Sequence, residues 1–261
     1  MARKLSLASG VLPEFGAVDV VEAGAATGFD AVGLWIDPET WSARHTRAAL
    51  ARTGMPVLDV EVVWIKPDSA LDDHRRVIDV GAELGAGNVL CVSSDPDHGA
   101  AAAKLSALCR HAEGSGMRVA LEFGIFTEVR NLKQALAVIG CVDHPLAAVL
   151  VDPIHVDRSG TTAAEVAAID PALLPYAQFC DARATRPDPA DFAAVIADAV
   201  DFREQCGEGA LPLAALLEAL PADVPLSIEL RSAALREAFS HPALRARAVL
   251  DATRGWLDRL A

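Results

Sequence analysis

The sequence predicts an α/β fold, a single (β/α)8 barrel spanning residues 1–261, and two patterns lead to that prediction. Eight short β-like segments recur along the chain, with helix-like stretches between them. Most of the eight are continuous apolar runs, which is typical of strands buried on both faces of a parallel sheet. Eight alternating strands and helices form the pattern of a closed barrel, and no Ser/Pro-rich linker divides the chain.

The elements follow one another in regular order. The expected strands cover residues 4–9, 30–35, 57–65, 88–93, 118–123, 147–152, 176–181 and 225–230, and the expected helices cover 16–27, 41–53, 71–85, 99–114, 131–140, 161–168, 189–204, 212–220 and 241–260. The first two helices end before Gly28 and Gly54, because glycine is a common helix-terminating residue. A doubly wound sheet would need a GxGxxG turn after its first strand, and SLASGVLPEFG lacks that pattern.

Composition excludes several classes of partner. The 261 residues are 52% hydrophobic and carry a net charge of −13, which disfavours nucleic acid and anionic membrane surfaces. We expect neither a signal peptide nor a membrane span. Five cysteines at positions 91, 109, 141, 180 and 206 show no zinc or CxxC spacing. We therefore expect reduced thiols and a cytoplasmic location.

Acidic residues stand where apolar strands end. VALEFG places Glu122 there, VLVDPIH places Asp152 and LSIELR places Glu229, while Gln178 lies in the seventh strand. The carboxyl ends of barrel strands meet at one mouth, where several carboxylates would repel one another unless a cation lay among them. Oxygen ligands suit Mg²⁺ or Mn²⁺. The alternative is that each acid separately caps the helix that follows it.

These segments resemble the xylose isomerase-like TIM-barrel superfamily of sugar phosphate isomerases and epimerases. The family pattern is a Glu ending strand 5, Asp-x-x-His after strand 6, His or Gln on strand 7, and Glu ending strand 8. Here the matching segments are VALEFG, DPIH, AQFCDA and SIEL, and GEGALPL (207–213) resembles the family's loop before strand 8. The resemblance runs over nearly the whole chain and is strongest from 118 to 231.

The resemblance implies a set of roles. A single divalent ion would be held by Glu122, Asp152, Gln178 and Glu229, with Mn²⁺ or Mg²⁺ expected and Zn²⁺ or Co²⁺ as alternatives. Glu122 and Glu229 would also be the catalytic proton-transfer pair, and His155 would hold a substrate oxygen. Independently, strands 5 and 8 stand far apart around an eight-strand ring, so the two glutamates can approach a substrate from different sides.

Five further residues are predicted to bind or position the substrate. Arg203 precedes the Gly-Glu-Gly turn, as an arginine does in several relatives; its alternative is a solvated arginine at a helix end. Asp181 would orient Gln178 or a substrate hydroxyl, or else cap the following loop. Glu208 would contact one end of the substrate. Glu61 would support the ligands, and Trp35 would be an apolar wall or plain packing.

One position departs from the ketose 3-epimerases. Gln178 stands where they carry His, which is closer to the hydroxypyruvate isomerase or inosose dehydratase side of the superfamily. The sequence also shows no Gly-rich phosphate cradle near strands 7 and 8. The substrate therefore need not be phosphorylated.

Three functions remain in view. The first is a divalent-metal-dependent isomerase or epimerase of carbohydrate metabolism, acting on a small polyhydroxylated carbonyl compound through an enediolate. The second is a metal-dependent dehydratase of the inosose or dehydroshikimate type, with His155 as the acid. The third is a barrel that binds a metabolite without chemistry. Endonuclease IV shares this barrel, but a DNA-repair role would need more metal-binding histidines and a basic groove. The partner is a small molecule, and a homodimer is left open.

Overall fold

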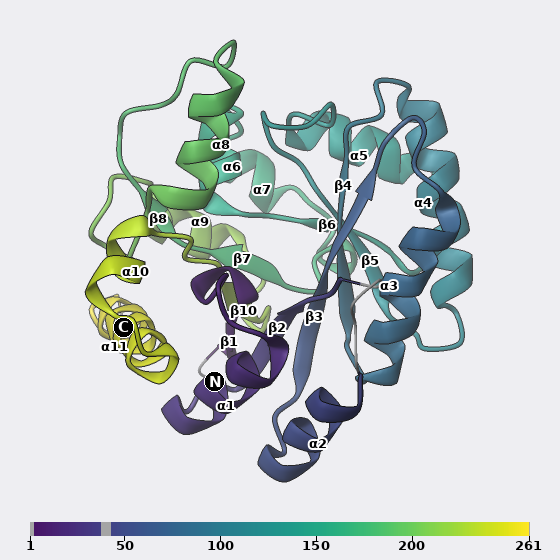
Figure 1. Cartoon of the computed structure of the whole chain (residues 1–261). Coiled ribbons are helices and arrows are strands. Elements are labelled where there is room, and N and C mark those ends of the chain that lie inside the picture. The colour runs from purple at the N-terminus through teal and green to yellow at the C-terminus, as the bar shows by residue number, and fades with distance from the viewer. Residues whose placement is uncertain (1–2, 38–42, 261) are drawn as a thin grey trace.

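The computed structural model describes residues 3–37 and 43–260, and it shows the predicted ring of parallel strands (Figure 1). The strands follow the order β6-β5-β4-β3-β2-β1-β10-β7. Each predicted strand is present: β1 (Leu5–Leu7), β2 (Ala31–Trp35), β3 (Val57–Ile65), β4 (Asn88–Ser93), β5 (Arg118–Glu122), β6 (Ala147–Leu150), β7 (Ala177–Phe179) and β10 (Leu226–Ile228). The prediction of a single eight-stranded (β/α)8 barrel is confirmed.

The ring closes between β6 and β7, the two ends of the strand order. A backbone hydrogen bond from Gln178 N to Val151 O, 2.9 Å long, joins these two ends. We call this junction the seam of the barrel. Gln178 and the acids that end β5 and follow β6 all lie next to it.

Helices cover the outside of the ring. They are α1 (Ala17–Thr27), α2 (Ala43–Thr53), α3 (Leu71–Glu83), α4 (His98–Ala112), α5 (Leu132–Gly140), α6 (Pro153–Arg158), α7 (Ala163–Ala167), α8 (Phe192–Asp201), α9 (Leu213–Ala219), α10 (Ala233–Ala238) and α11 (Pro242–Asp258), with 3-10 turns at Ser9–Val11 and Pro171–Leu173. In Figure 1, α1 and α11 lie side by side although they come from opposite ends of the chain. Within the described ranges, none of these helices combines the length and apolar character that crossing a bilayer requires.

The apolar core has two layers. The larger lies between the strands and the helices and contains residues such as Leu7, Val60 and Leu105. The smaller fills the inside of the ring, where Leu90, Ala148 and Tyr176 pack together. Because the interior is packed in this way, a ligand of the barrel would bind at its mouth and not inside the ring.

Several elements differ from the predicted ones. The helix expected at 189–204 ends at Asp201, and Arg203–Glu204 forms a short strand, β9, antiparallel to β8 (Asp181–Ala182). Arg203 is therefore buried in a strand and is not a solvated helix-end arginine. Helices α6 and α10, of six residues each, were not predicted. Residues 41–42 of the second expected helix lie outside the described residues.

Candidate metal centre and active-site cavity

The carboxyl ends of the strands open into a cavity of about 360 Å³. Its lining includes charged and polar side chains, which we call the floor, and apolar side chains, which we call the walls. The floor residues are Glu61, Glu122, His155, Gln178, Arg203, Glu229 and Arg231. The cavity therefore gathers most of the predicted site at the expected mouth.

A compact cluster of potential ligands lies at this floor. Glu122, Asp152 and His155 each offer one atom within 4.8 Å of the others, and all three are buried. Glu122 is the last residue of β5. Asp152 caps α6, because its Oδ1 accepts a hydrogen bond of 3.1 Å from Ile154 N, and Pro153 opens the helix. His155 follows three residues later on the same helix, so its Nε2 lies 3.9 Å from Asp152 Oδ2.

Gln178 extends this cluster from β7. Its amide lies between the two carboxylates: with Nε2 turned toward them, it donates to Glu122 Oε1 at 2.8 Å and to Asp152 Oδ2 at 3.0 Å. Rotating the amide by 180° would instead point its oxygen at a cation held among these carboxylates. Together with His155, the two carboxylates and this amide form a donor set that fits a divalent ion.

Glu229 follows β10 and reaches the floor, where its two carboxylate oxygens have different surroundings. Its Oε1 accepts a 2.6 Å hydrogen bond from Arg231 Nε. Its Oε2 is buried and has no hydrogen-bond partner within the described part of the chain. A buried carboxylate oxygen of this kind is costly unless something compensates it, so one oxygen of Glu229 remains available to a ligand.

Arg203 links several of these elements and competes for one of the predicted ligands. Its Nη1 donates to Asp152 Oδ2 at 2.5 Å and to the carbonyl oxygen of Glu229 at 3.0 Å, and its Nε donates to the Ala199 carbonyl at 2.6 Å. The side chain is 4% exposed. Arg203 therefore fixes the ligand cluster instead of reaching toward the cavity centre, and Asp152 shares its Oδ2 between the arginine and any ion.

The acids of the floor differ in their tendency to ionise. Burial, together with repulsion from Asp152, raises the pKa of Glu122 well above its usual value. Burial and the nearby Glu229 raise the pKa of Glu61 to about 7, although Arg231 and a hydrogen bond from Ser9 oppose the shift. Burial acts in the same direction on Asp152, but Arg203, His155 and the backbone N–H of Ile154 together outweigh it and hold that pKa below its ordinary value. Without a cation, the cluster thus retains protons that a divalent ion would displace.

His155 remains neutral in this environment. Burial lowers the pKa of His155 to about 4, although the charge of Asp152 opposes the shift. Its ring packs against Phe126 with the centroids 4.9 Å apart. A neutral imidazole offers a nitrogen lone pair, so His155 is placed to ligate a metal as well as to hold a substrate oxygen.

Two of the predicted substrate-binding residues lie elsewhere. Asp181 sits on β8 outside the barrel ring, and its carboxylate accepts hydrogen bonds from the backbone nitrogens of Ala182, Gly207 and Leu211 at 2.8 to 3.0 Å. Asp181 therefore caps the following loop, which was the alternative to its predicted role in orienting Gln178 or a substrate hydroxyl. Glu208 is exposed in the same loop and does not line the cavity. Neither position offers a group to a ligand at the floor.

Sequence reasoning did not assign a site role to Arg231 or to two aromatic residues, Phe126 and Phe192, that line the cavity. Arg231 follows Glu229 by two residues, so a signal for it was present in LSIELR. The aromatic residues left no comparable signal, because they come from a loop and a helix start that fold back over the mouth.

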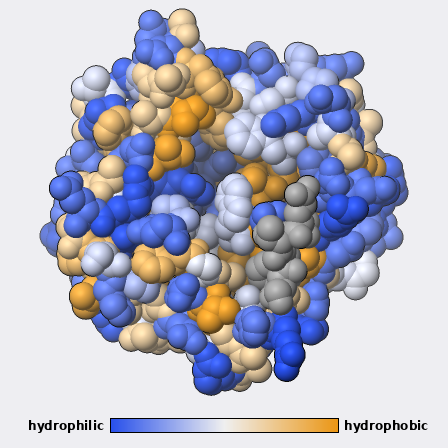
Figure 2. Space-filling model, in the orientation of Figure 1, coloured by the Kyte–Doolittle hydropathy of each residue, from blue (hydrophilic) through white to orange (hydrophobic). Residues whose placement is uncertain are grey.

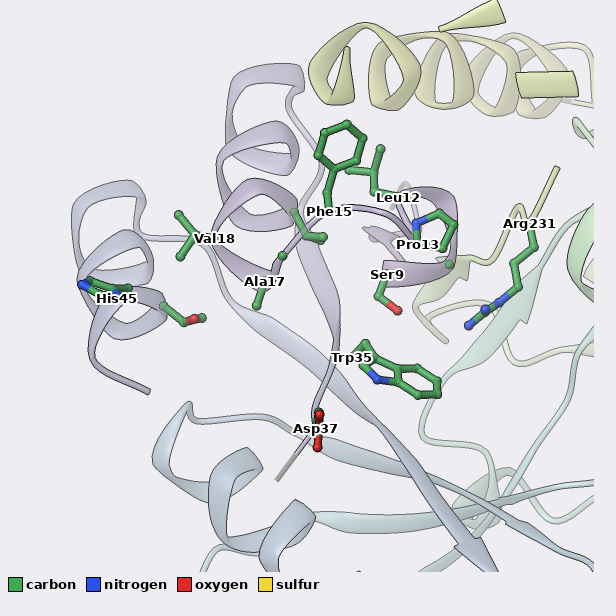
Figure 3. Close-up of a pocket in the computed structure, with 14 residues that line it drawn as sticks. Ser9, Leu12, Pro13, Phe15, Ala17, Val18, Trp35, Asp37, His45 and Arg231 are labelled. Atoms are coloured by element: carbon green, nitrogen blue, oxygen red, sulfur yellow. The ribbon is translucent and has the colours of Figure 1, made fainter. Parts of the chain in front are cut away.

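A second cavity of about 530 Å³ adjoins the first (Figure 3). Trp35 and Arg231 line both cavities. Figure 3 shows Ser9, Trp35 and Arg231 near one another, with His45 farther away. The half-exposed Trp35 ring therefore stands at the boundary between the two spaces.

Gly10 leaves room for the Glu229–Arg231 pair, and we expect Gly10→Ala to disrupt it. An added Cβ would lie 2.2 Å from Glu229 Oε1 and 2.6 Å from Arg231 Nε. We expect a loss of about 1–3 kcal/mol in unfolding free energy, measured by urea denaturation. Gly114→Ala is the matched control, because no described atom lies within 4 Å of its added Cβ. Equal stabilities for the two variants would contradict the close approach.

Known structures show the same architecture. A xylose isomerase-like TIM barrel/4-hydroxyphenylpyruvate dioxygenase fusion protein matches with 23% identity and a TM-score of 0.81, over 99% of this chain and 44% of that chain. An IOLI protein with a bound zinc atom matches with 15% identity and a TM-score of 0.80, over 98% of this chain and 97% of that one. D-allulose 3-epimerase from Methylomonas sp., in complex with D-allulose, matches with 14% identity and a TM-score of 0.74, over 99% and 97%.

At these identities the structural likeness shows the fold alone, and this chain spans less than half of the fusion protein. No curated protein sequence matches the chain closely enough to count as a relative. The sequence profile described as "Xylose isomerase-like TIM barrel" matches residues 21–259. Because that match covers almost the entire barrel, the chain belongs to the xylose isomerase-like TIM-barrel family.

Proposed function

We propose that this protein is a divalent-metal-dependent isomerase or epimerase of a small hydroxylated carbonyl compound. The observation that carries the proposal is the buried cluster of Glu122, Asp152 and His155, whose ligand atoms lie within 4.8 Å of one another, next to the Gln178 amide. The solved structures of similar fold support the same class, since one is an epimerase in complex with a ketose and another holds zinc.

The ion would be held by Glu122, Asp152, Gln178 and the unpartnered Oε2 of Glu229, with His155 within reach as a further ligand. Mn²⁺ or Mg²⁺ suits the oxygen atoms, and the nearby imidazole also admits Zn²⁺ or Co²⁺. When bound, such an ion supplies a Lewis acid that acidifies a C–H bond next to a carbonyl group.

Proton transfer is assigned to Glu122 and Glu229. Going from β5 through β6 and β7 to β10, the two glutamates stand three strand positions apart around the ring, so they face a substrate from different sides. One carboxylate removes the proton from the carbon between carbonyl and hydroxyl, which gives an enediolate, and the other returns a proton.

A dehydratase would need an acid at the leaving hydroxyl. His155 is poorly suited to that role, because burial lowers its pKa to about 4, so the runner-up function would need another acid, such as Glu61 with its pKa of about 7.

Metal binding and proton exchange test the proposal together. The protein is stripped with EDTA, titrated with Mn²⁺ in a calorimeter, and incubated with small hydroxy ketones in D₂O with and without the ion. We expect binding of one Mn²⁺ per chain and metal-dependent exchange of the carbon-bound proton with no loss of water. Absence of Mn²⁺ binding would favour a metabolite-binding barrel, and a new enone absorbance would favour the dehydratase.

A further inference from the structure

The walls of the 360 Å³ cavity differ in chemistry from its floor. Apolar side chains from β2, β3, the segment after β5, and α8 form them, among them Trp35, Val62, Trp64, Phe126, Phe192 and Ile196. In Figure 2, hydrophobic residues also gather beside a hollow near the centre of the face shown.

Two aromatic side chains at this cavity are unusually exposed. Only five large apolar side chains in the described part of the chain are exposed, and Trp35 (50%) and Phe192 (61%) are two of them. Both line the same cavity. Large aromatic surface left in water is unfavourable, and aromatic side chains gathered at a concave site are typical of ligand-covering walls. The two rings are therefore placed to close over an apolar group.

Apart from the indole N–H of Trp35, the wall side chains named above offer no free hydrogen-bonding group to a polyol. The indole nitrogen of Trp64 already donates to Ser94 Oγ at 2.9 Å. Val62, Ile196 and Phe126 offer no polar side-chain atoms. A hydroxyl buried against such a wall loses its water partners without replacement, which lowers affinity by roughly tenfold for each group. An open-chain sugar with hydroxyls along its length would incur this loss repeatedly.

We propose that the substrate is an α-hydroxy carbonyl compound whose two neighbouring oxygens face the floor and whose remainder is an apolar, ring-sized group. For the reacting end of the substrate, this inference rests on the proposed function. For the rest of the substrate, it specifies the chemical class. A cavity of about 360 Å³ is within the usual size of small-ligand sites. The floor recognises the reacting oxygens, and the walls select against a polyol.

Two ketones with the same reacting end test the inference. 2-Hydroxyacetophenone carries a phenyl group where dihydroxyacetone carries a hydroxymethyl group. Each is titrated calorimetrically into the full chain with Mg²⁺ supplied. We expect the phenyl compound to bind at least about tenfold more tightly. Equal affinity, or tighter binding of dihydroxyacetone, would overturn the inference.

Phe192→Ala tests the wall directly. Phe192 is the first residue of α8 and is largely exposed, so its truncation should leave folding intact. We expect about fivefold weaker binding of 2-hydroxyacetophenone and a change below twofold for dihydroxyacetone. Leu244→Ala on α11 is the matched control, since Leu244 is 60% exposed and lies away from the cavity. Equal losses for both ketones in Phe192→Ala would contradict the assignment of the wall.

Failure of the inference and failure of the proposed function are distinguishable by proton exchange in D₂O. If dihydroxyacetone exchanges its carbon-bound protons with the ion present while the phenyl compound is excluded, the inference is wrong and the proposed function stands. In a second case, the phenyl compound binds preferentially and neither ketone exchanges its carbon-bound protons with Mg²⁺ or Mn²⁺ present. The proposed function is then wrong, and the preference of the walls for an apolar ligand stands.

Discussion

Replacing Glu122 by Gln is expected to lower turnover by about a thousandfold or more, because the change removes both a proposed metal ligand and a proposed base. The neutral amide keeps the shape of the side chain but cannot accept a proton from carbon. Glu229→Gln should have a comparable effect for the same reason. The measurement is the rate of substrate proton exchange with Mn²⁺ supplied, compared with the unsubstituted protein.

The same substitution should act in the opposite direction on stability when no ion is present. Because the pKa of Glu122 is raised in the folded protein, folding retains a proton that the unfolded chain releases above its ordinary value of 4.5. At neutral pH the unfolded chain, in which Glu122 ionises freely, is therefore stabilised relative to the folded protein. Glu122→Gln removes this loss of folding stability. We expect a gain of about 1–3 kcal/mol in chelator at pH 7 and almost none at pH 4, measured by urea denaturation.

Glu218→Gln on α9 provides the matched control, since Glu218 is exposed and does not line either cavity. Its turnover and its stability should both match those of the unsubstituted protein. Near-normal exchange in Glu122→Gln would remove the proton-transfer assignment, and a loss of stability in chelator would contradict the proposed protonation of this side chain.

Removal of the buried guanidinium in Arg203→Met should destabilise the protein by about 3–5 kcal/mol. The substitution leaves Asp152, which is fully buried, without its cationic partner, and it frees the carbonyl oxygens of Ala199 and Glu229. Arg247→Met is the control, because the Arg247 side chain is 45% exposed and its ion pair with Asp251 is long, at 3.8 Å. Thermal and urea denaturation in chelator give the two values.

A second substitution separates charge from packing. If the cost of Arg203→Met comes from the unpaired carboxylate, adding Asp152→Asn should recover about half of the loss or more. Mn²⁺ should also stabilise Arg203→Met more than it stabilises the unsubstituted protein, because the ion then provides the only positive charge next to Asp152. Strict additivity of the two substitutions would show that Asp152 and Arg203 are not energetically coupled.

The architecture could be predicted from the sequence because each barrel strand and each long helix carries its own local signal. Apolar runs such as VLDVEVVWI specify strands wherever they lie, and the observed bounds of β3 match the predicted ones. The short antiparallel pair β8–β9 carried no such signal, since it exists only because distant residues meet.

The candidate site was predictable to the extent that it follows strand ends. Glu122, Gln178 and Glu229 lie at the cavity floor because β5, β7 and β10 end where their apolar runs suggest. Asp181 was placed there by the same reasoning, but β7 ends at Phe179, so the chain has already left the ring at that position. The pairing of Arg203 with Asp152 depends on residues 51 apart in sequence, which no local pattern reports.

The seam between β6 and β7 links ion binding to the integrity of the barrel. A backbone hydrogen bond from Gln178 to Val151 joins the ring there. The proposed ligands come from both sides of this junction. An ion shared by Glu122, Asp152 and Gln178 would therefore bridge the two strands that meet at the seam. Ion binding would then stabilise the closed ring as well as build the site.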